Sequence, residues 1–153
     1  GGIDGINMAV VGRLEHRNVS ALLRGLTLYN DVKVTLIPIS GQADPDVISY
    51  CEDNGIEFVS AADIGAVSEV DAIYLNGPRT VAHVQLLRAR GSFNIRIDGE
   101  LMSMLKPHCI IMDPMQRSGD FAVDVQDQRL AFYRQAENAL YVRMALLSLM
   151  LRS

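Results

Sequence analysis

Short apolar runs alternate with polar, turn-forming segments along the whole chain. Five of these runs have the length and the aliphatic content of strands buried on both faces of a sheet: Ile6–Val11, Val32–Pro38, Ile56–Val59, Asp71–Leu75 and Cys109–Met112. Parallel strands of this kind need long crossovers, which are usually helical. The pattern therefore predicts an α/β fold: a doubly wound, mostly parallel five-stranded sheet with helices on both faces.

The segments between the runs carry helix start signals. Asn18, Asp44 and Asp98 each precede a segment with an apolar helical face and are the predicted N-caps, and Pro45 stands at the first helical position after Asp44. Residues predicted to face inward on these helices are Val19, Leu22, Leu23, Leu26, Val47, Ile48, Cys51, Leu101, Met102 and Leu105.

Two shorter segments are also expected to be helical. Ser60, with Asp63 three residues later, resembles a capping box and predicts a brief helix that runs through Val67. After the fourth strand, a helix is predicted with Val81, Val84 and Leu87 facing inward.

The end of the chain differs from the rest. A single long helix is predicted from Leu130 to Ser153, and Arg143 is the only charged residue between Ala139 and Leu151. A helix that is apolar nearly all round must be buried on more than one side. It is either a core helix of this domain or a helix that packs partly on something missing from this chain, and we favour the second interpretation.

Composition narrows the class of protein. The 153 residues are 49% hydrophobic with a mean hydropathy of +0.15, which indicates a further buried interface. The net charge of −4 and the lack of a Lys/Arg cluster argue against a nucleic-acid partner. No apolar run reaches the roughly 18 to 20 residues of a membrane span. Because the chain starts at Gly1 without an initiator Met, we expect it to be a piece of a longer polypeptide.

Common cofactor motifs are not found in the sequence. Cys51 and Cys109 fall in apolar patterns and form no C-x-x-C motif, which is typical of reduced core thiols in a cytoplasmic protein. The three histidines have no metal-ligand spacing. Gly12 follows the first strand but belongs to no G-x-G-x-x-G fingerprint. We therefore expect neither a metal nor a cofactor.

Two places are candidate ligand sites. The Cys109–Met112 run breaks at Asp113-Pro114, and ligands gather at the carboxyl ends of strands in open parallel sheets. After the first strand, Arg13 and Arg17 lie in a loop and at a helix N-terminus, which together are suited to holding an anion. The alternatives are an ordinary Pro turn at the first place and a solvated surface loop at the second.

The tail carries the strongest resemblance to a known family. Residues 131–147, AFYRQAENALYVRMALL, are similar to the aromatic start, Gln-Ala, Asn and Arg-x-Ala-Leu-Leu of the aspartate carbamoyltransferase family. Weaker support comes from Gly12 with the Arg-Asn-Val-Ser of 17–20, and from Val123-Asp124-Val125. The resemblance runs from about Gly5 to Leu151, so that residues 1–153 look like the amino-acid-binding half of such an enzyme.

The resemblance implies a larger assembly. Enzymes of this family join a carbamoyl-phosphate domain to the amino-acid domain, and the active site lies between the two domains and a neighbouring subunit of a trimer. Their last helix crosses back onto the first domain, which also holds the phosphate-gripping Ser-Thr-Arg-Thr motif and the catalytic His. Since this sequence contains neither, the resemblance implies half of a cytoplasmic transferase of pyrimidine biosynthesis, with no catalytic residue assigned in this chain. The complete enzyme is then expected to be a homotrimer or a larger assembly.

By resemblance, three places bind the acceptor substrate. Arg17 matches an arginine that holds a carboxylate. Arg79 lies near the family's Arg-Val-Gln slot and is expected to reach the same ligand. Pro114 and Met115 match the Pro-Leu pair whose backbone carbonyls orient the carbamoyl group and the attacking amine.

The chain departs from the family pattern within these places. Gly77 stands where the family has the first Arg of Arg-Val-Gln, and Asp113 stands where it has the His of His-Pro-Leu-Pro. Loss of a desolvated, carboxylate-binding Arg costs roughly 2–5 kcal/mol. One hypothesis is an active transferase for aspartate or a related amino acid. The alternative is a catalytically degenerate homologue that serves as a structural or regulatory subunit. The third is an unrelated α/β binding domain.

Overall fold

A parallel sheet organises the molecule. The computed structural model describes residues 2–77, 82, 85–86, 89, 96–114, 122–123 and 125–152. The strands are β1 (Asn7–Arg13), β2 (Lys33–Ser40), β3 (Glu57–Ser60), β4 (Ala72–Asn76), β5 (Arg96–Ile97), β6 (Ile110–Met112) and β7 (Ala122–Val123). The helices are α1 (Arg17–Leu26), α2 (Pro45–Asp53), the 3₁₀ helix η1 (Ile64–Val67), α4 (Gly99–Met104) and α5 (Phe132–Met150).

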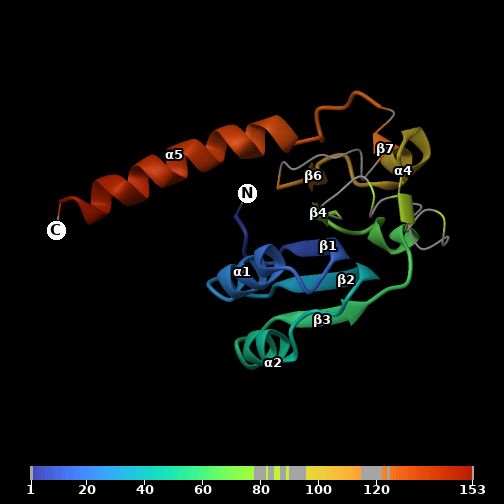
Figure 1. Cartoon of the computed structure of the whole chain (residues 1–153). Helices are drawn as coiled ribbons and strands as arrows, with labels where there is room; N and C mark the ends of the chain where they lie inside the picture. Colours follow the sequence, from blue (N-terminus) through green and yellow to red (C-terminus); the bar gives the residue numbers. More distant parts are fainter. Residues whose placement is uncertain are drawn as a thin grey trace.

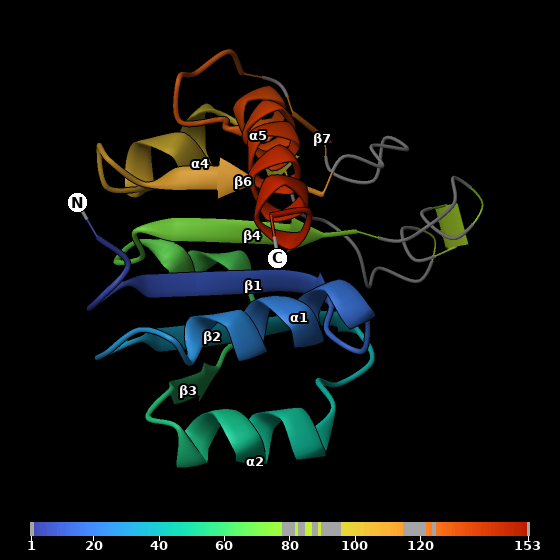
Figure 2. The same ribbon diagram turned by 90° about the vertical axis from the view of Figure 1, so that its left-hand side faces the viewer.

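The five predicted strands form one sheet in the order β3-β2-β1-β4-β6, and every pair is parallel. The central strand β1 pairs on both sides, with Met8 opposite Val34 of β2 and Ala72 of β4. Helices α1 and α2 cover one face of the sheet, while η1 and α4 cover the other (Figures 1 and 2). The predicted doubly wound fold is confirmed.

Side chains that point alternately to the two faces of the sheet form one apolar core on each face. On β1, Val10 packs in the cluster that includes α1 and α2, whereas Ala9 and Val11 pack in the cluster that includes η1 and α4. Because successive side chains of a strand point to opposite faces, a strand that is apolar at every position needs cover on both sides. The continuous run in β1 satisfies that condition.

Helix starts agree with the sequence in part. Asp44 and Asp98 cap α2 and α4 as predicted, by accepting the backbone N–H of Asp46 and of Leu101. Two predicted caps were wrong. His16, not Asn18, caps α1, since its Nδ1 accepts the Asn18 N–H at 3.3 Å.

The cap of η1 differs in the same way. Asp63 accepts the Gly65 N–H at 2.8 Å, so the helix begins after Asp63 and the expected capping box at Ser60 does not form. Ser60 is instead the last residue of β3. A helix was also predicted after β4, and the residues of that stretch that the structure describes, Ala82, Gln85, Leu86 and Ala89, are helical and exposed. The residues predicted to face inward on it, Val81, Val84 and Leu87, lie outside the described residues.

Two features were not predicted. Strands β5 and β7 form a small parallel sheet of two residues each. Residues 129–131 add a partial strand beside β6, where Ile111 forms a parallel bridge to Leu130. The Ile111 N–H donates to the Arg129 carbonyl and the Ala131 N–H donates to the Ile111 carbonyl, each at 2.8 Å.

Helix α5 projects from the body of the molecule, and it is seen nearly end-on in Figure 2. Phe132 is its one buried residue, at 3% exposure, and exposure reaches 85% at Leu151, just beyond the helix. Large apolar side chains along it are nonetheless exposed: Leu140, Tyr141, Val142, Met144, Leu146, Leu147, Leu149 and Met150. Of the two interpretations of the tail, a core helix of this domain was therefore wrong.

Candidate functional site

The carboxyl ends of β1, β4 and β6 meet at one edge of the sheet, because these neighbouring strands are parallel. In open α/β sheets this edge is where ligands bind. We call it the carboxyl-edge site and define its described part by Arg17, Asn76, Gly77, Asp113 and Pro114.

Close contact between β1 and β4 forms the floor of the site. Gly12 has φ +126°, and a Cβ placed there would lie 2.1 Å from the backbone oxygen of Asn76. The buried Asn76 side chain donates through Nδ2 to the Arg13 carbonyl at 2.7 Å. The pairing of β1 with β2 shifts register between Gly12 and Arg13. The floor is therefore a tight junction of backbone segments.

The turn after β1 leaves one of its two arginines available. Arg13 forms an ion pair with Glu15, with Nε 3.1 Å from Oε1. Arg17, the first residue of α1, is exposed, and its guanidinium forms no ion pair or hydrogen bond with the described part of the chain. A guanidinium in this position can bind a carboxylate through two parallel hydrogen bonds. Of the predicted anion-binding pair, Arg17 is thus the available group.

The elbow after β6 forms the other side of the site. Asp113 is buried, at 4% exposure, and its backbone N–H donates to the side-chain Oε1 of Gln135 at 2.9 Å. Pro114 follows and is half-buried. Burial raises the pKa of the Tyr74 hydroxyl, and the negative charge of Asp113 raises it further. The elbow therefore presents a buried negative charge close to the end of β4.

Not every predicted site residue can be located. Arg17 and Pro114 lie at the same sheet edge, on either side of the end of β4, as the sequence predicts. Gly77 is half-buried directly after β4. Arg79 and Met115 lie outside the described residues. Their predicted roles stay predictions.

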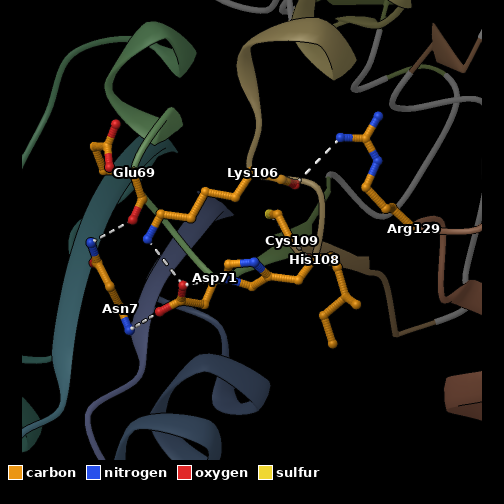
Figure 3. Close-up of polar contacts among 8 residues, drawn as sticks. Asn7, Glu69, Asp71, Lys106, His108, Cys109 and Arg129 are labelled. Carbon is orange, nitrogen blue, oxygen red and sulfur yellow. Dashed lines mark hydrogen bonds and ion pairs between the residues drawn. The ribbon is translucent and has the colours of Figure 1, made fainter. Parts of the chain in front are cut away.

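A polar cluster that sequence reasoning missed lies at the opposite, amino edge of the sheet (Figure 3). The Asp71 carboxylate accepts the Asn7 N–H at 2.9 Å, and its Oδ1 lies 3.1 Å from Lys106 Nζ and 3.0 Å from His108 Nε2. Burial raises the pKa of Asp71, but the bonds from Asn7, His108 and Lys106 and the charge of Lys106 outweigh it and lower that pKa to about 2.

This cluster ties together segments that are far apart in the sequence. It joins β1, the start of β4 and the connection between α4 and β6, and Arg129 extends it by donating to the Leu105 and Lys106 carbonyls at 3.4 Å each. Its ionised groups are already paired, so we assign it a structural role. Within the described residues, no group of three or more His, Cys, Asp or Glu side chains is placed to hold a metal ion.

A helix that crosses a membrane needs about 20 mostly apolar residues. None of the described helices is both long enough and apolar enough to cross a bilayer. Cys51 and Cys109 are buried free thiols, as predicted.

Comparison with known proteins agrees with the geometry. The family model described as "Aspartate/ornithine carbamoyltransferase, Asp/Orn binding domain" matches residues 4–150. The chloroplastic aspartate carbamoyltransferase of Oryza sativa subsp. japonica is 33% identical over 159 residues, covering 99% of this chain and 43% of that protein. The aspartate carbamoyltransferase catalytic subunit of Clostridium botulinum (strain Eklund 17B / Type B) is 30% identical, covering 98% of this chain and 51% of that protein.

Solved structures give the same result. Aspartate transcarbamoylase from Trypanosoma cruzi in complex with carbamoyl aspartate and phosphate superimposes with a TM-score of 0.80 at 26% identity, over 96% of this chain and 49% of that one. The chain thus spans about half the length of the relatives that it matches. Since the family model covers nearly the whole chain, the chain belongs to the aspartate/ornithine carbamoyltransferases and corresponds to their Asp/Orn-binding domain.

Proposed function

We propose that this chain is the acceptor-binding half of an aspartate carbamoyltransferase. In the proposed reaction the acceptor amine attacks the carbamoyl carbon of carbamoyl phosphate, a C–N bond forms, phosphate leaves with the electrons of the broken C–O bond, and the amine loses a proton. The observation that carries the proposal is that the available Arg17 guanidinium and the Asp113-Pro114 elbow lie at the same edge of the sheet, on either side of the end of β4. A relative crystallised with carbamoyl phosphate and aspartate supports this assignment.

Each site residue has a distinct proposed role. Arg17 binds a carboxylate of the acceptor and fixes its orientation. The Pro114 carbonyl accepts a hydrogen bond from the attacking amine, and Met115 is expected to offer a second carbonyl. Arg79 is proposed to bind the acceptor from the segment after β4. This half contributes to catalysis by positioning the attacking amine and by electrostatic stabilisation of the transition state.

The rest of the enzyme is proposed to come from a carbamoyl-phosphate-binding domain. The exposed apolar surface of α5 supports this, because a patch of this extent on a free surface marks an interaction site. We propose that α5 packs on that domain, that the domain supplies the catalytic groups, and that the complete enzyme is a cytoplasmic homotrimer in pyrimidine biosynthesis.

A second candidate function is a catalytically degenerate subunit with a structural or regulatory role. Two residues favour it: Gly77 provides no side chain at the end of β4, and Asp113 places a buried carboxylate close to where anionic substrates would bind. Both changes reduce the affinity of the carboxyl edge for anions.

A ureido-product assay separates the two candidates. The full gene product is incubated with carbamoyl phosphate and a panel of amino acids, and turnover with one acceptor supports the transferase. Arg17→Ala should then raise the KM for that acceptor about 10- to 100-fold, since a hydrogen bond to a charged group contributes about 1.5–3 kcal/mol. Arg24→Ala is the matched control, because it removes another guanidinium of α1, which lies 4.9 Å from the ring centre of Tyr50 on α2 and away from the carboxyl edge. Folded protein without turnover for any acceptor would favour the degenerate subunit.

A further inference from the structure

The start of α5 is attached to β6 through backbone groups. The carbonyl and the N–H of Ile111 are both bonded to residues 129–131, and the Phe132 ring packs in the same core cluster as Ile111. One turn later, the Gln135 N–H donates to the Ala131 carbonyl at 2.7 Å. The first turn of α5 therefore has a fixed position relative to the last strand of the sheet.

Gln135 uses this position to hold the elbow. Its Oε1 accepts the Asp113 N–H at 2.9 Å in a partly buried setting. Asp113 is the first residue beyond β6, so its N–H lies where the regular strand pairing ends. A buried N–H without a partner costs about 1–3 kcal/mol, and the Gln135 oxygen satisfies it.

Fixing that one N–H restrains the carbonyl of Pro114. The bond fixes the plane of the peptide between Met112 and Asp113. The proline ring locks φ of Pro114 near −65°, and it also restricts the preceding residue to extended conformations. Few freely rotating backbone dihedral angles therefore remain between that peptide plane and the Pro114 carbonyl. The direction of that carbonyl thus depends on whether Gln135 is in place.

We infer that Gln135 is a positioning residue, which holds the Asp113-Pro114 elbow so that the Pro114 carbonyl faces the acceptor amine. The inference rests on the proposed function for its catalytic consequence. It also links two parts of the molecule, since the helix that carries Gln135 is the one whose outer part is exposed. Docking of α5 and the geometry of the acceptor site are then coupled through one hydrogen bond.

The test uses Gln135→Met in the full gene product. This variant has nearly the same size as the native side chain and lacks the accepting oxygen. Gln135→Asn, which keeps the amide but is one methylene too short, is the second variant in case the first does not fold. Thr27→Val is the matched control, because it removes one side-chain hydrogen bond to backbone, from Thr27 Oγ1 to the Arg24 carbonyl at 2.7 Å, away from the site.

Two readouts are needed. Hydrogen exchange followed by mass spectrometry should show faster exchange in the peptide covering 110–114 for both Gln135 variants and no change there for Thr27→Val. The kcat for carbamoyl transfer should fall 10- to 100-fold in the Gln135 variants, with the KM for carbamoyl phosphate unchanged, because the misdirected carbonyl acts on the attacking amine. A merely structural residue would not produce this division between kcat and KM.

Each outcome has a definite meaning. Unchanged exchange at 110–114 would overturn the inference, because the bond would not be holding the elbow. Faster exchange with unchanged kcat would overturn the positioning role. If the wild-type gene product has no transferase activity, the proposed function fails, and the exchange measurement still decides whether Gln135 holds the elbow.

Discussion

Replacing Gly12 by Ala should destabilise the protein more than the same change at any open glycine. Gly12 lies at the floor of the carboxyl-edge site with φ +126°, and the added Cβ would lie 2.1 Å from the Asn76 oxygen and 2.7 Å from its carbonyl carbon. Both atoms are backbone of the adjacent strand, so neither can rotate away. The substitution forces β1 and β4 apart or twists the end of β1.

The magnitude has two parts. Holding a non-glycine residue in this region of φ costs about 1–3 kcal/mol. Overpacking against a fixed neighbour costs about 1–3 kcal/mol more. The expected loss in free energy of unfolding is therefore about 2–6 kcal/mol, which is a large part of the roughly 5–15 kcal/mol by which proteins are stable.

Urea denaturation measures the effect, and Gly55→Ala is the control. Gly55 has φ +86°, but nothing lies within 4 Å of the position that a Cβ would take. Its substitution should cost only the backbone strain, about 1–2 kcal/mol. The close contact accounts for about 1–3 kcal/mol of the difference, and with a slope of about 2 kcal/mol per molar urea the two variants should differ in midpoint by roughly 0.5–1.5 M. Equal midpoints would refute the close-contact reasoning.

Three further results are expected. The pKa of Asp71 in the folded protein is about 2, below its ordinary value of 3.8, so the stability that Asp71 contributes is complete above about pH 5 and is lost as the pH falls towards 2. Asp71→Asn should therefore flatten the curve of unfolding free energy against pH between about pH 5 and 2. An unchanged curve would contradict the cluster's structural role. Because burial raises the pKa of Cys109 to about 11 and that of Cys51 in the same direction, a thiol reagent at pH 8 should label neither cysteine until denaturant is added. The 153-residue chain should self-associate in sedimentation experiments at high concentration, and Leu146→Glu should weaken that association; strictly monomeric wild-type protein would count against α5 as an interaction surface.

The sheet could be predicted because its signal is local and repeated. The inner strands are runs of aliphatic residues that pack on both faces, and β1 shows this most clearly, with Ala9, Val10 and Val11 all fully buried. The edge strand β3 was wrongly expected to be buried in the same way, since Glu57, Val59 and Ser60 are exposed and Phe58 is half-buried. Helix caps were less predictable. Both His16 and Asn18 are polar residues near the start of α1, and only the observed bond from the Asn18 N–H to His16 Nδ1 shows which one caps it.

The site was predictable only where it follows directly from strand order. Arg17 and Pro114 each come after a strand, and parallel pairing brings those strand ends to one edge. The bond between Asp113 and Gln135 could not be predicted, because it joins residues 22 positions apart through a side chain. The Asp71 cluster depends in the same way on a contact between Asn7 and Asp71, which no periodicity encodes.

The order β2-β1-β4 has a consequence for synthesis of the chain. The central strand β1 pairs with β2, the next strand in the sequence, on one side and with β4 on the other. The hydrogen bond between Asn7 and Asp71, at the start of the β1–β4 pair, joins residues 64 positions apart. At a translation rate of about 5–20 residues per second, that gap lasts roughly 3–13 s. During this interval a nascent β1 presents an open, aliphatic edge on the ribosome. Until β4 emerges, that edge is open to pairing with other strands.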